Sequence, residues 1–396
     1  MMLIWHNKKV SLMTKTNQKI PEGWSVKKLG ECTLSFSGGT PSADKSEYYE
    51  NGTIPFIRSG EISQDFTELF ITEKGLEKSS AKMVKKGDLL LALYGANSGD
   101  SSICKIDGAI NQAILCIRTK EDNLNFLESL FVIYKDKIIH KYLQGGQGNL
   151  SAKIIKSLCF MFPPLPEQEK IAEILGTWDT AIEKLSALIE QKKRLKKGLM
   201  QRLLNFEKDY LKRFDEIFED HSDKRHPEKD LLSATQENGV VPRRLLKGRV
   251  MSPEGSLDGY KLVQPGNFVI SLRSFQGGLE YSDYEGIISP AYTVLKDKIP
   301  INKCFYRYFF KSYNFIEKYL SIAVIGIRDG KQISYPDLQS VKIPYPPLPE
   351  QKAIADVLSK ADEEIDLLTK KLSLLQEQKK GLMQQLLTGQ IRVKVA

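Results

Sequence analysis

The residue types that most often carry catalysis or bind metals form no such pattern in this chain. The five cysteines are scattered without a CxxC pair, which is typical of reduced thiols in a cytoplasmic protein. No HExxH, serine elbow or strand-following GxGxxG is present, nor the Asn-Pro-Pro-Tyr or Asp-Pro-Pro-Tyr stretch of an adenine-flipping methyltransferase. The histidines, which lack metal-ligand spacing, are His6, His140, His221 and His226.

One stretch, GIRDGK at 326–331, superficially resembles a phosphate-binding loop. It has one residue too few between its glycines, and Gln332 stands where a serine or threonine would coordinate magnesium. We therefore expect no nucleotide binding there, and no catalytic site, cofactor or metal in the chain as a whole.

Amide and basic side chains gather instead in polar loops. Arginine and lysine read guanine, asparagine and glutamine read adenine, and cationic side chains bind phosphates. The glycine-rich loop at 144–149 and its counterpart at 325–332 carry such residues, although solvated surface loops would look the same. The residues predicted to contact DNA are Arg58, Gln144, Gln147, Asn149, Lys153, Lys156, Arg273, Gln276, Arg328, Lys331 and Gln332.

A duplicated segment must position these loops. The stretch from Pro163 to Leu204 begins PPLPEQ and ends GLMQRLL, and it aligns without a gap with Pro346 to Leu387, which ends GLMQQLL. Proline and glutamate at the start of each copy predict a helix N-terminus. The apolar positions recur in steps of four and three, which favours a coiled-coil seam over an amphipathic helix on a globular core. The seam residues are Ile171, Leu175, Trp178, Ile182, Leu185, Ile189, Lys192, Lys196, Leu199 and Leu203, and then Ile354, Leu358, Ala361, Ile365, Leu368, Leu372, Leu375, Lys379, Leu382 and Leu386.

Each copy follows a globular segment with the same order of predicted elements. Strands are expected at 89–94 and 109–118, a helix at 124–143, and corresponding elements at 268–272, 287–295 and 304–320. The pattern predicts an α+β fold with two similar mixed domains separated by an antiparallel pair of long coiled-coil helices. The predicted parts are a leader (1–19), a first domain (20–162), a central helix (163–205), a second domain (206–345) and a C-terminal helix (346–396).

Composition agrees with a nucleic-acid partner. The chain has 396 residues, a formal net charge of +9 and a pI near 9.0, which suit a polyanion. The basic run from Gln191 to Arg213 either follows the phosphates of spacer DNA or is a solvated helix face. No run approaches membrane-spanning length, so we expect a cytoplasmic protein with no membrane partner.

These motifs together resemble a known family. The PEGW opening at Pro21, the SGGTP turn at 37–41, both PPLPEQ helices and the LTGQIRV ending at 387–393 are similar to the specificity subunit of type I restriction–modification enzymes. The resemblance covers nearly the whole chain from about residue 20. The second globular segment departs from it, because its opening from Arg213 to Gly248 lacks a clear GGTP turn.

The resemblance implies a non-catalytic DNA reader with two target-recognition domains, each reading half of a bipartite double-stranded site. It also implies that the helices act as spacer and dock two methyltransferase subunits, and that a restriction (translocase) subunit joins the complex. Adenine methylation and ATP-dependent cleavage would then belong to the partner subunits. The alternatives are a coiled-coil scaffold that binds no DNA, and part of a self-sufficient methyltransferase or nuclease.

Overall fold

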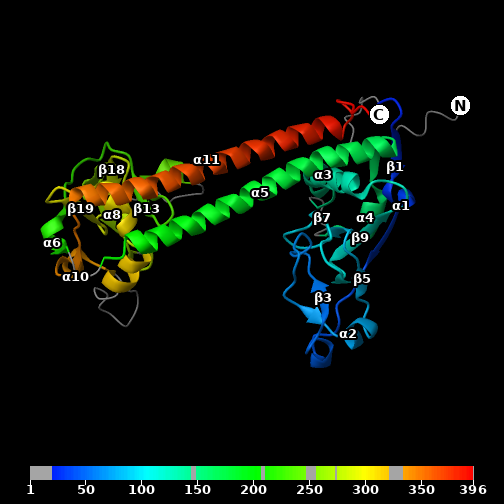
Figure 1. The fold of residues 1–396 in the computed structure, drawn as a ribbon, viewed down its shortest axis with the longest axis horizontal. Helices are drawn as coiled ribbons and strands as arrows, with labels where there is room; N and C mark the ends of the chain where they lie inside the picture. The colour runs from blue at the N-terminus through cyan, green and yellow to red at the C-terminus, as the bar shows by residue number, and fades with distance from the viewer. Residues whose placement is uncertain are drawn as a thin grey trace. The chain divides into compact units, whose positions relative to one another are not determined.

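The computed structural model describes residues 20–143, 149–206, 210–246, 256–272, 274–320 and 333–395. The chain divides into two compact units. Unit 1 comprises Met1–Lys184 and Leu372–Ala396, and unit 2 comprises Leu185–Lys371. Two long helices, α5 (Leu165–Leu203) and α11 (Leu348–Leu386), each contribute to both units (Figure 1).

Unit 1 contains two four-stranded sheets. Their strand orders are β2-β9-β6-β7 and β4-β3-β8-β5. A further short pair joins β1, at the start of the unit, to β10, which comes just before α5. The elements are β1 (Ser25–Lys28), α1 (Leu29–Cys32), β2 (Thr33–Ser37), η1 (Ser46–Tyr48), β3 (Ile54–Ile57), β4 (Phe70–Ile71), α2 (Glu73–Glu77), β5 (Lys82–Val84), β6 (Leu89–Ala92), β7 (Ser101–Ile103), β8 (Gly108–Ile110), β9 (Ile114–Thr119), α3 (Leu124–Leu143), α4 (Ala152–Ser157) and β10 (Cys159–Phe162).

Unit 2 repeats the first of these sheets as β12-β19-β16-β17 and the short pair as β11–β20. Two further pairs, β13–β14 and β15–β18, are antiparallel. The elements are β11 (Leu211–Arg213), α6 (Phe214–Ile217), β12 (Phe218–His221), β13 (Leu232–Thr235), β14 (Gly239–Pro242), η2 (Arg243–Leu245), β15 (Lys261–Val263), β16 (Phe268–Ile270), α7 (Ser274–Gly277), β17 (Glu280–Tyr281), β18 (Gly286–Ile288), β19 (Thr293–Asp297), α8 (Lys303–Phe309), η3 (Phe315–Leu320), α10 (Tyr335–Gln339) and β20 (Lys342–Pro344).

The same turn leads into the central strand of each unit. Asp88 accepts a hydrogen bond from the backbone N–H of Lys85 (2.8 Å), and Asn267 accepts one from Gln264 (2.8 Å). The glycine in each turn has a positive φ, +97° at Gly87 and +92° at Gly266, which a side chain would disfavour. These turns explain why strands begin at Leu89 and Phe268, as the sequence predicts.

Three predicted elements are wrong in detail, because each is interrupted by a turn. The stretch 109–118 forms β8 and β9, and 287–295 contributes to β18 and β19. In the first case Asn111 makes the turn by accepting a hydrogen bond from the N–H of Ala113 (3.0 Å). The predicted helix at 304–320 divides into α8 and the π-helical η3, because the Ser312 hydroxyl accepts from the N–H of Phe315 (3.1 Å) and donates to the carbonyl of Phe309 (2.7 Å).

Each unit has its own apolar core. In unit 1, α3 packs into the core through Phe126, Leu130, Phe131 and Ile138, which are all buried. Unit 2 instead has an aromatic cluster in which Phe310 contacts the rings of Phe268 (5.0 Å between centroids) and Phe315 (4.8 Å). Edge-to-face and tilted rings at these distances add to the stabilisation from burial alone.

A buried glutamine ties the start of each long helix to its own unit. The Gln168 side chain accepts a hydrogen bond from the N–H of Asn123 (2.9 Å) and donates to the carbonyl of Pro163 (2.9 Å). Gln351 makes the same two bonds, to the N–H of Asn302 (2.8 Å) and the carbonyl of Pro346 (2.8 Å). The repeated PPLPEQ motif is therefore a repeated anchor between helix and domain.

The predicted seam is confirmed. None of its twenty positions on α5 and α11 is exposed, including Lys192, Lys196 and Lys379. In unit 1 Asp179 pairs with Lys379. In unit 2 Asp362 pairs with Lys196 (2.5 Å) and Glu364 with Lys192 (2.6 Å). Within each unit the two helix segments therefore run antiparallel, with their lysine ammonium groups paired across the seam.

Glu128, on α3, lies in the electrostatic environment of the pair formed by Asp179 and Lys379. Burial and the negative charge of Asp179 raise the pKa of Glu128 from 4.5 to about 7, although Lys379 acts in the opposite direction. Because the pKa is higher in the folded chain than in the unfolded chain, its stabilising effect is complete below about pH 4.5. That effect is lost as the pH rises through about 7.

We therefore predict that Glu128→Gln reduces the pH dependence of the stability of unit 1. Between pH 5 and pH 8 the free energy of unfolding of the wild type should fall, relative to that of the variant, by up to about 3 kcal/mol. Urea unfolding of the full chain at both pH values measures this difference. Glu169→Gln, at an exposed position on α5, is the matched control, and a parallel pH response in wild type and Glu128→Gln would contradict the prediction.

Candidate nucleic-acid interface

The predicted DNA-contacting residues fall into two groups. Five lie in the described part of the chain, and these are Arg58, Asn149, Lys153, Lys156 and Gln276. The other six lie outside the described residues, so their predicted contacts stay predictions. These are Gln144, Gln147, Arg273, Arg328, Lys331 and Gln332.

The short helix α4 holds two of the predicted lysines at the surface of unit 1. Its N-cap is Ser151, whose hydroxyl accepts a hydrogen bond from the N–H of Ile154 (3.3 Å), and Ile155 is buried in the core. On the opposite side Lys153 and Lys156 are exposed. The described part of the chain records no ion pair for either lysine, so both ammonium groups are available to an anion.

Arg58 directly follows β3 and is held in an ion-pair network. Its guanidinium donates to Glu61 from Nη2 (2.7 Å) and Nε (3.2 Å), and to Glu68 from Nη2 (2.6 Å). Burial would raise the pKa of Glu61, but hydrogen bonds from Arg58, Thr67 and the backbone N–H of Glu68 lower it to about 2. Arg58 therefore holds its own loop together, and contact with a base would require it to leave these carboxylates.

Gln276 lies on α7 and is exposed. The turn into α7 is fixed by the buried Ser274, whose hydroxyl accepts from the N–H of Ser271 (2.8 Å). The structure thus places Gln276 on a defined element of unit 2, whereas Asn149, Lys153 and Lys156 belong to unit 1.

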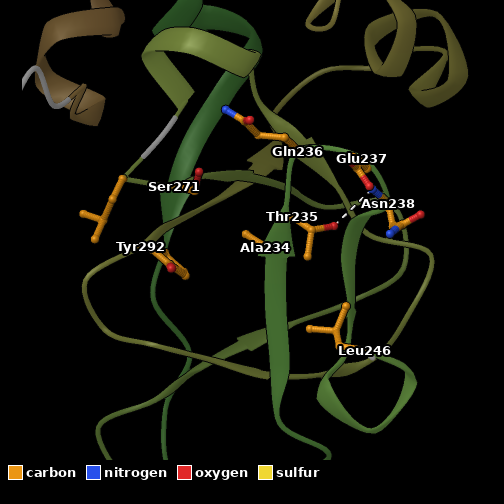
Figure 2. A pocket seen from close by; sticks show the side chains of 9 residues that line it. Ala234, Thr235, Gln236, Glu237, Asn238, Leu246, Ser271 and Tyr292 are labelled. Atoms are coloured by element: carbon orange, nitrogen blue, oxygen red, sulfur yellow. Dashed lines mark hydrogen bonds between the residues drawn. The ribbon is translucent and has the colours of Figure 1, made fainter. Parts of the chain in front are cut away.

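The sequence reasoning missed a polar hollow in unit 2. It has a volume of about 580 Å³ and surrounds the turn of the β13–β14 hairpin (Figure 2). The Thr235 hydroxyl accepts from the N–H of Asn238 (3.0 Å) and donates to the carbonyl of Gly239 (3.0 Å). The lining residues are Ala234, Thr235, Gln236, Glu237, Asn238, Leu246, Ser271, Leu272 and Tyr292.

A smaller hollow lies in unit 1, with a volume of about 430 Å³. It is formed by the connection between β3 and β4, which contains the Arg58 network. Phe66 is 59% exposed beside it, an unusual position for a phenylalanine. The lining residues are Arg58, Gly60, Glu61, Gln64, Phe66 and Glu68.

A sequence signal for the unit 2 hairpin was present. Asn238-Gly239 is a strong hairpin dipeptide, and Gly239 has a φ of +70°. It lies in the opening of the second domain, from Arg213 to Gly248, which is the part of that domain least like the first copy. No comparable dipeptide marks the connection in unit 1.

Other kinds of site are not found in the described ranges. Within them, no group of three or more histidine, cysteine, aspartate or glutamate side chains could hold a metal ion. Among the helices described, none combines the length and apolar character needed to cross a membrane.

A family model and two relatives from one organism match most of this chain. The family model described as "Type I restriction modification DNA specificity domain" matches residues 21–193 and 212–377. The specificity subunit of the type I restriction enzyme MjaVIII from Methanocaldococcus jannaschii is 29% identical, over 95% of each chain. The putative MjaX specificity subunit from the same organism is 27% identical, again over 95% of each chain.

A solved structure shares the fold. The crystal structure of the type I restriction–modification S subunit from M. genitalium aligns with a TM-score of 0.56, over 94% of this chain and 98% of that chain. The sequence identity in this alignment is 16%, so the likeness concerns the fold alone.

The Arg58 network leads to a prediction about stability. Arg58→Ala removes the main hydrogen-bond donor of the buried Glu61 carboxylate, so we expect unit 1 to lose about 1–3 kcal/mol of stability. The loss should shrink as the pH falls toward about 2, where Glu61 becomes protonated in the folded chain as well. Chemical unfolding of the full chain measures the change. Lys153→Ala removes an exposed cation that forms no ion pair with any described residue, and it serves as the control. Equal stability of the two variants would contradict a structural role for Arg58.

Proposed function

The chain belongs to the family of type I restriction–modification DNA specificity subunits, and from this premise we propose that each of its two target-recognition domains reads one half of a split DNA site. Recognition of DNA sequence is the function of the family. Its members are non-catalytic, and the catalytic activities reside in the other subunits of the complex.

One observation carries the proposal of two readers. The sheet β2-β9-β6-β7 recurs as β12-β19-β16-β17, with the same antiparallel pairings, while the exposed connections of the two units differ in length and composition. A repeated scaffold with divergent loops supports two readers of one architecture and different base preference. We assign these readers to residues 20–162 and 206–345, and the long helices to 163–205 and 346–396.

The long helices take two roles in this proposal. They act as the spacer between the half-sites, which is supported by their length of 39 residues each and by a seam in which no position is exposed. They also dock two methyltransferase subunits, which a restriction (translocase) subunit joins. We assign this docking to a surface that includes the leucines exposed on the helix segments of unit 2. These are Leu188, Leu195 and Leu367.

We assign DNA contact to predicted residues inside the described part of the chain and to predicted residues outside it. In the described part of the chain, Lys153 and Lys156 suit phosphate contacts, and Asn149 and Gln276 suit base edges. Arg58 remains in the proposed set, and its contact with DNA would require the guanidinium to leave Glu61 and Glu68. The remaining members, on sequence grounds, are Gln144, Gln147, Arg273, Arg328, Lys331 and Gln332.

The proposed function can be tested by identifying the DNA motif that is methylated in cells. We expect cells that express this chain with its methyltransferase subunits to methylate a split motif, with two short specific parts and a gap of fixed length. Sequencing that detects methylated adenine reads the motif directly, and cells with the methyltransferase alone are the control. A continuous motif, or methylation that does not depend on this chain, would reject the proposal.

The lysines of α4 give a second prediction. Because each phosphate contact releases a counterion, Lys153→Gln and Lys156→Gln should each reduce the slope of log affinity against log salt by about one. Affinity should fall alike for cognate and unrelated duplexes, since phosphates carry no sequence information. Fluorescence anisotropy of the complex with its methyltransferase subunits, over a range of salt concentrations, measures both effects.

The control for this experiment is Lys352→Gln. Lys352 is exposed on α11, where it forms a surface ion pair with Asp356. An unchanged slope in the α4 variants would show that their ammonium groups do not contact phosphates. A change as large in Lys352→Gln would show that net charge alone is responsible.

A further inference from the structure

The two hollows described above lie at equivalent points of the two units. In unit 1, β3 runs parallel to β8, with Phe56 opposite Ala109. In unit 2 Leu231, the residue before β13, forms a parallel bridge with Ile287 of β18. The strands β8 and β18 correspond, since they pair in the same antiparallel way with β5 and β15. Thus β13 takes the place of β3, and β14 takes the place of β4.

The connections between these strands are the parts that differ. In unit 1 the connection runs from Arg58 to Leu69, and in unit 2 it is the three-residue turn from Gln236 to Asn238. The first surrounds a hollow of about 430 Å³ and the second one of about 580 Å³. We call these segments tip 1 (58–69) and tip 2 (236–238).

Both tips are fixed by polar contacts within their own unit. In tip 1 the buried Glu61 accepts hydrogen bonds from the guanidinium of Arg58, from the Thr67 hydroxyl (2.9 Å) and from backbone N–H groups. In tip 2 the Lys311 ammonium donates to the carbonyls of Gln236 (3.4 Å) and Gly277 (2.9 Å) and pairs with the buried Glu280 (2.7 Å). A fixed tip can present its remaining side chains without an ordering cost on binding.

The side chains at each tip that take no part in these fixing contacts have the chemistry of base recognition. The amides of Gln236 and Asn238 are exposed, and the described part of the chain records no hydrogen bond for either amide group. At tip 1 the half-buried Gln64 amide stands near the 59%-exposed ring of Phe66. Asparagine and glutamine form paired hydrogen bonds with N6 and N7 of adenine, and apolar rings contact the methyl group of thymine in the major groove.

We propose that tip 1 and tip 2 are the base-reading elements of the two domains, with Gln64 and Phe66 reading one half-site and Gln236 and Asn238 the other. The proposal rests on the function proposed above and adds the residues that set its specificity. The ligand of each hollow is the major-groove edge of an adenine·thymine base pair in duplex DNA. The glutamates beside them, Glu61 and Glu280, position the tips and do not contact the bases.

The experiment maps methylated motifs for variants of the full chain, expressed with its methyltransferase subunits. Asn238→Ala and Gln236→Ala should relax one position in one half of the motif and leave the other half unchanged. Gln64→Ala and Phe66→Ala should relax the opposite half. The expected loss of discrimination at the affected base pair is roughly 5- to 150-fold, measured as the ratio of methylation at the cognate and altered motifs.

A charge variant gives a sharper test at tip 2. Asn238→Asp keeps the turn, because aspartate suits the same backbone geometry, but it replaces an amide that pairs with adenine by an acceptor that pairs with the amino group of cytosine. The preferred base at one position should therefore change from adenine to cytosine. If Asn238→Ala lowers the midpoint of thermal unfolding, Asn238→Asp takes its place as the test of base reading by tip 2.

The controls separate the two proposals. Gln378→Ala removes an exposed amide on α11, which is part of neither tip, and should leave the motif unchanged. If the wild-type chain directs a split motif that all tip variants retain, the assignment of the tips is wrong while the proposed function stands. A tip variant of unchanged stability that alters both halves, or abolishes methylation altogether, likewise overturns the assignment. If the wild-type chain directs no split motif, the proposed function itself fails.

Discussion

The structure depends on a buried glutamine amide at the start of each long helix. A proline-rich turn follows a strand, and the carbonyl of its first proline lies close to the N–H of the residue that precedes a neighbouring helix, α3 in unit 1 and α8 in unit 2. Gln168 and Gln351 satisfy both groups at once, and Gln168 also donates to Asp122 (2.8 Å). Because an unpaired amide or carbonyl in such a place costs about 1–3 kcal/mol, no apolar residue of similar size could replace the glutamine without loss. The helix direction is thereby fixed relative to the domain from which it emerges.

The first unit strengthens this junction with contacts that are not repeated among the described residues of the second unit. Glu167 accepts hydrogen bonds from both Nε and Nη2 of Arg392 (2.8 Å each) and from the Trp24 indole (3.3 Å). Its counterpart in the repeat, Glu350, is exposed. The LTGQIRV ending is thus a structural part of unit 1. Gly389, with a φ of +70°, turns the chain after α11, and Arg392 then binds the start of α5 through Glu167.

Periodic features of the fold could be predicted from sequence, whereas the candidate site could be predicted only in part. The seam follows from the spacing of apolar residues, and the strands at Leu89 and Phe268 follow from the glycine turns before them. The breaks after Ile110 and Phe309 depend on single side-chain hydrogen bonds, from Asn111 and Ser312, which hydrophobic patterning does not register. The prediction that Arg58 contacts DNA rests on its charge and on its place after the apolar run 54–57. Its engagement with Glu61 depends on how a twelve-residue connection folds back on itself, which spacing cannot reveal.

The lysines within the seam show how polar breaks in an apolar repeat can fix the register of two paired helices more strictly than a fully apolar repeat would. In unit 2 Lys192 and Lys196 pair with Glu364 and Asp362 across the seam, and in unit 1 Lys379 pairs with Asp179. Asp179 and Asp362 occupy equivalent positions in the duplicated segment, as do Lys196 and Lys379. The same aspartate–lysine pair is therefore present twice, once in each unit. A slip of one heptad would leave each ammonium group against apolar side chains, and the desolvated charge would then oppose the slipped register. In unit 2 the phenol of Tyr308 also donates to Asp362 (2.7 Å), while in unit 1 the corresponding aspartate lies near Glu128. The same register lock therefore operates in two different environments, which leaves each domain free to diverge while the helix pairing within its unit stays fixed.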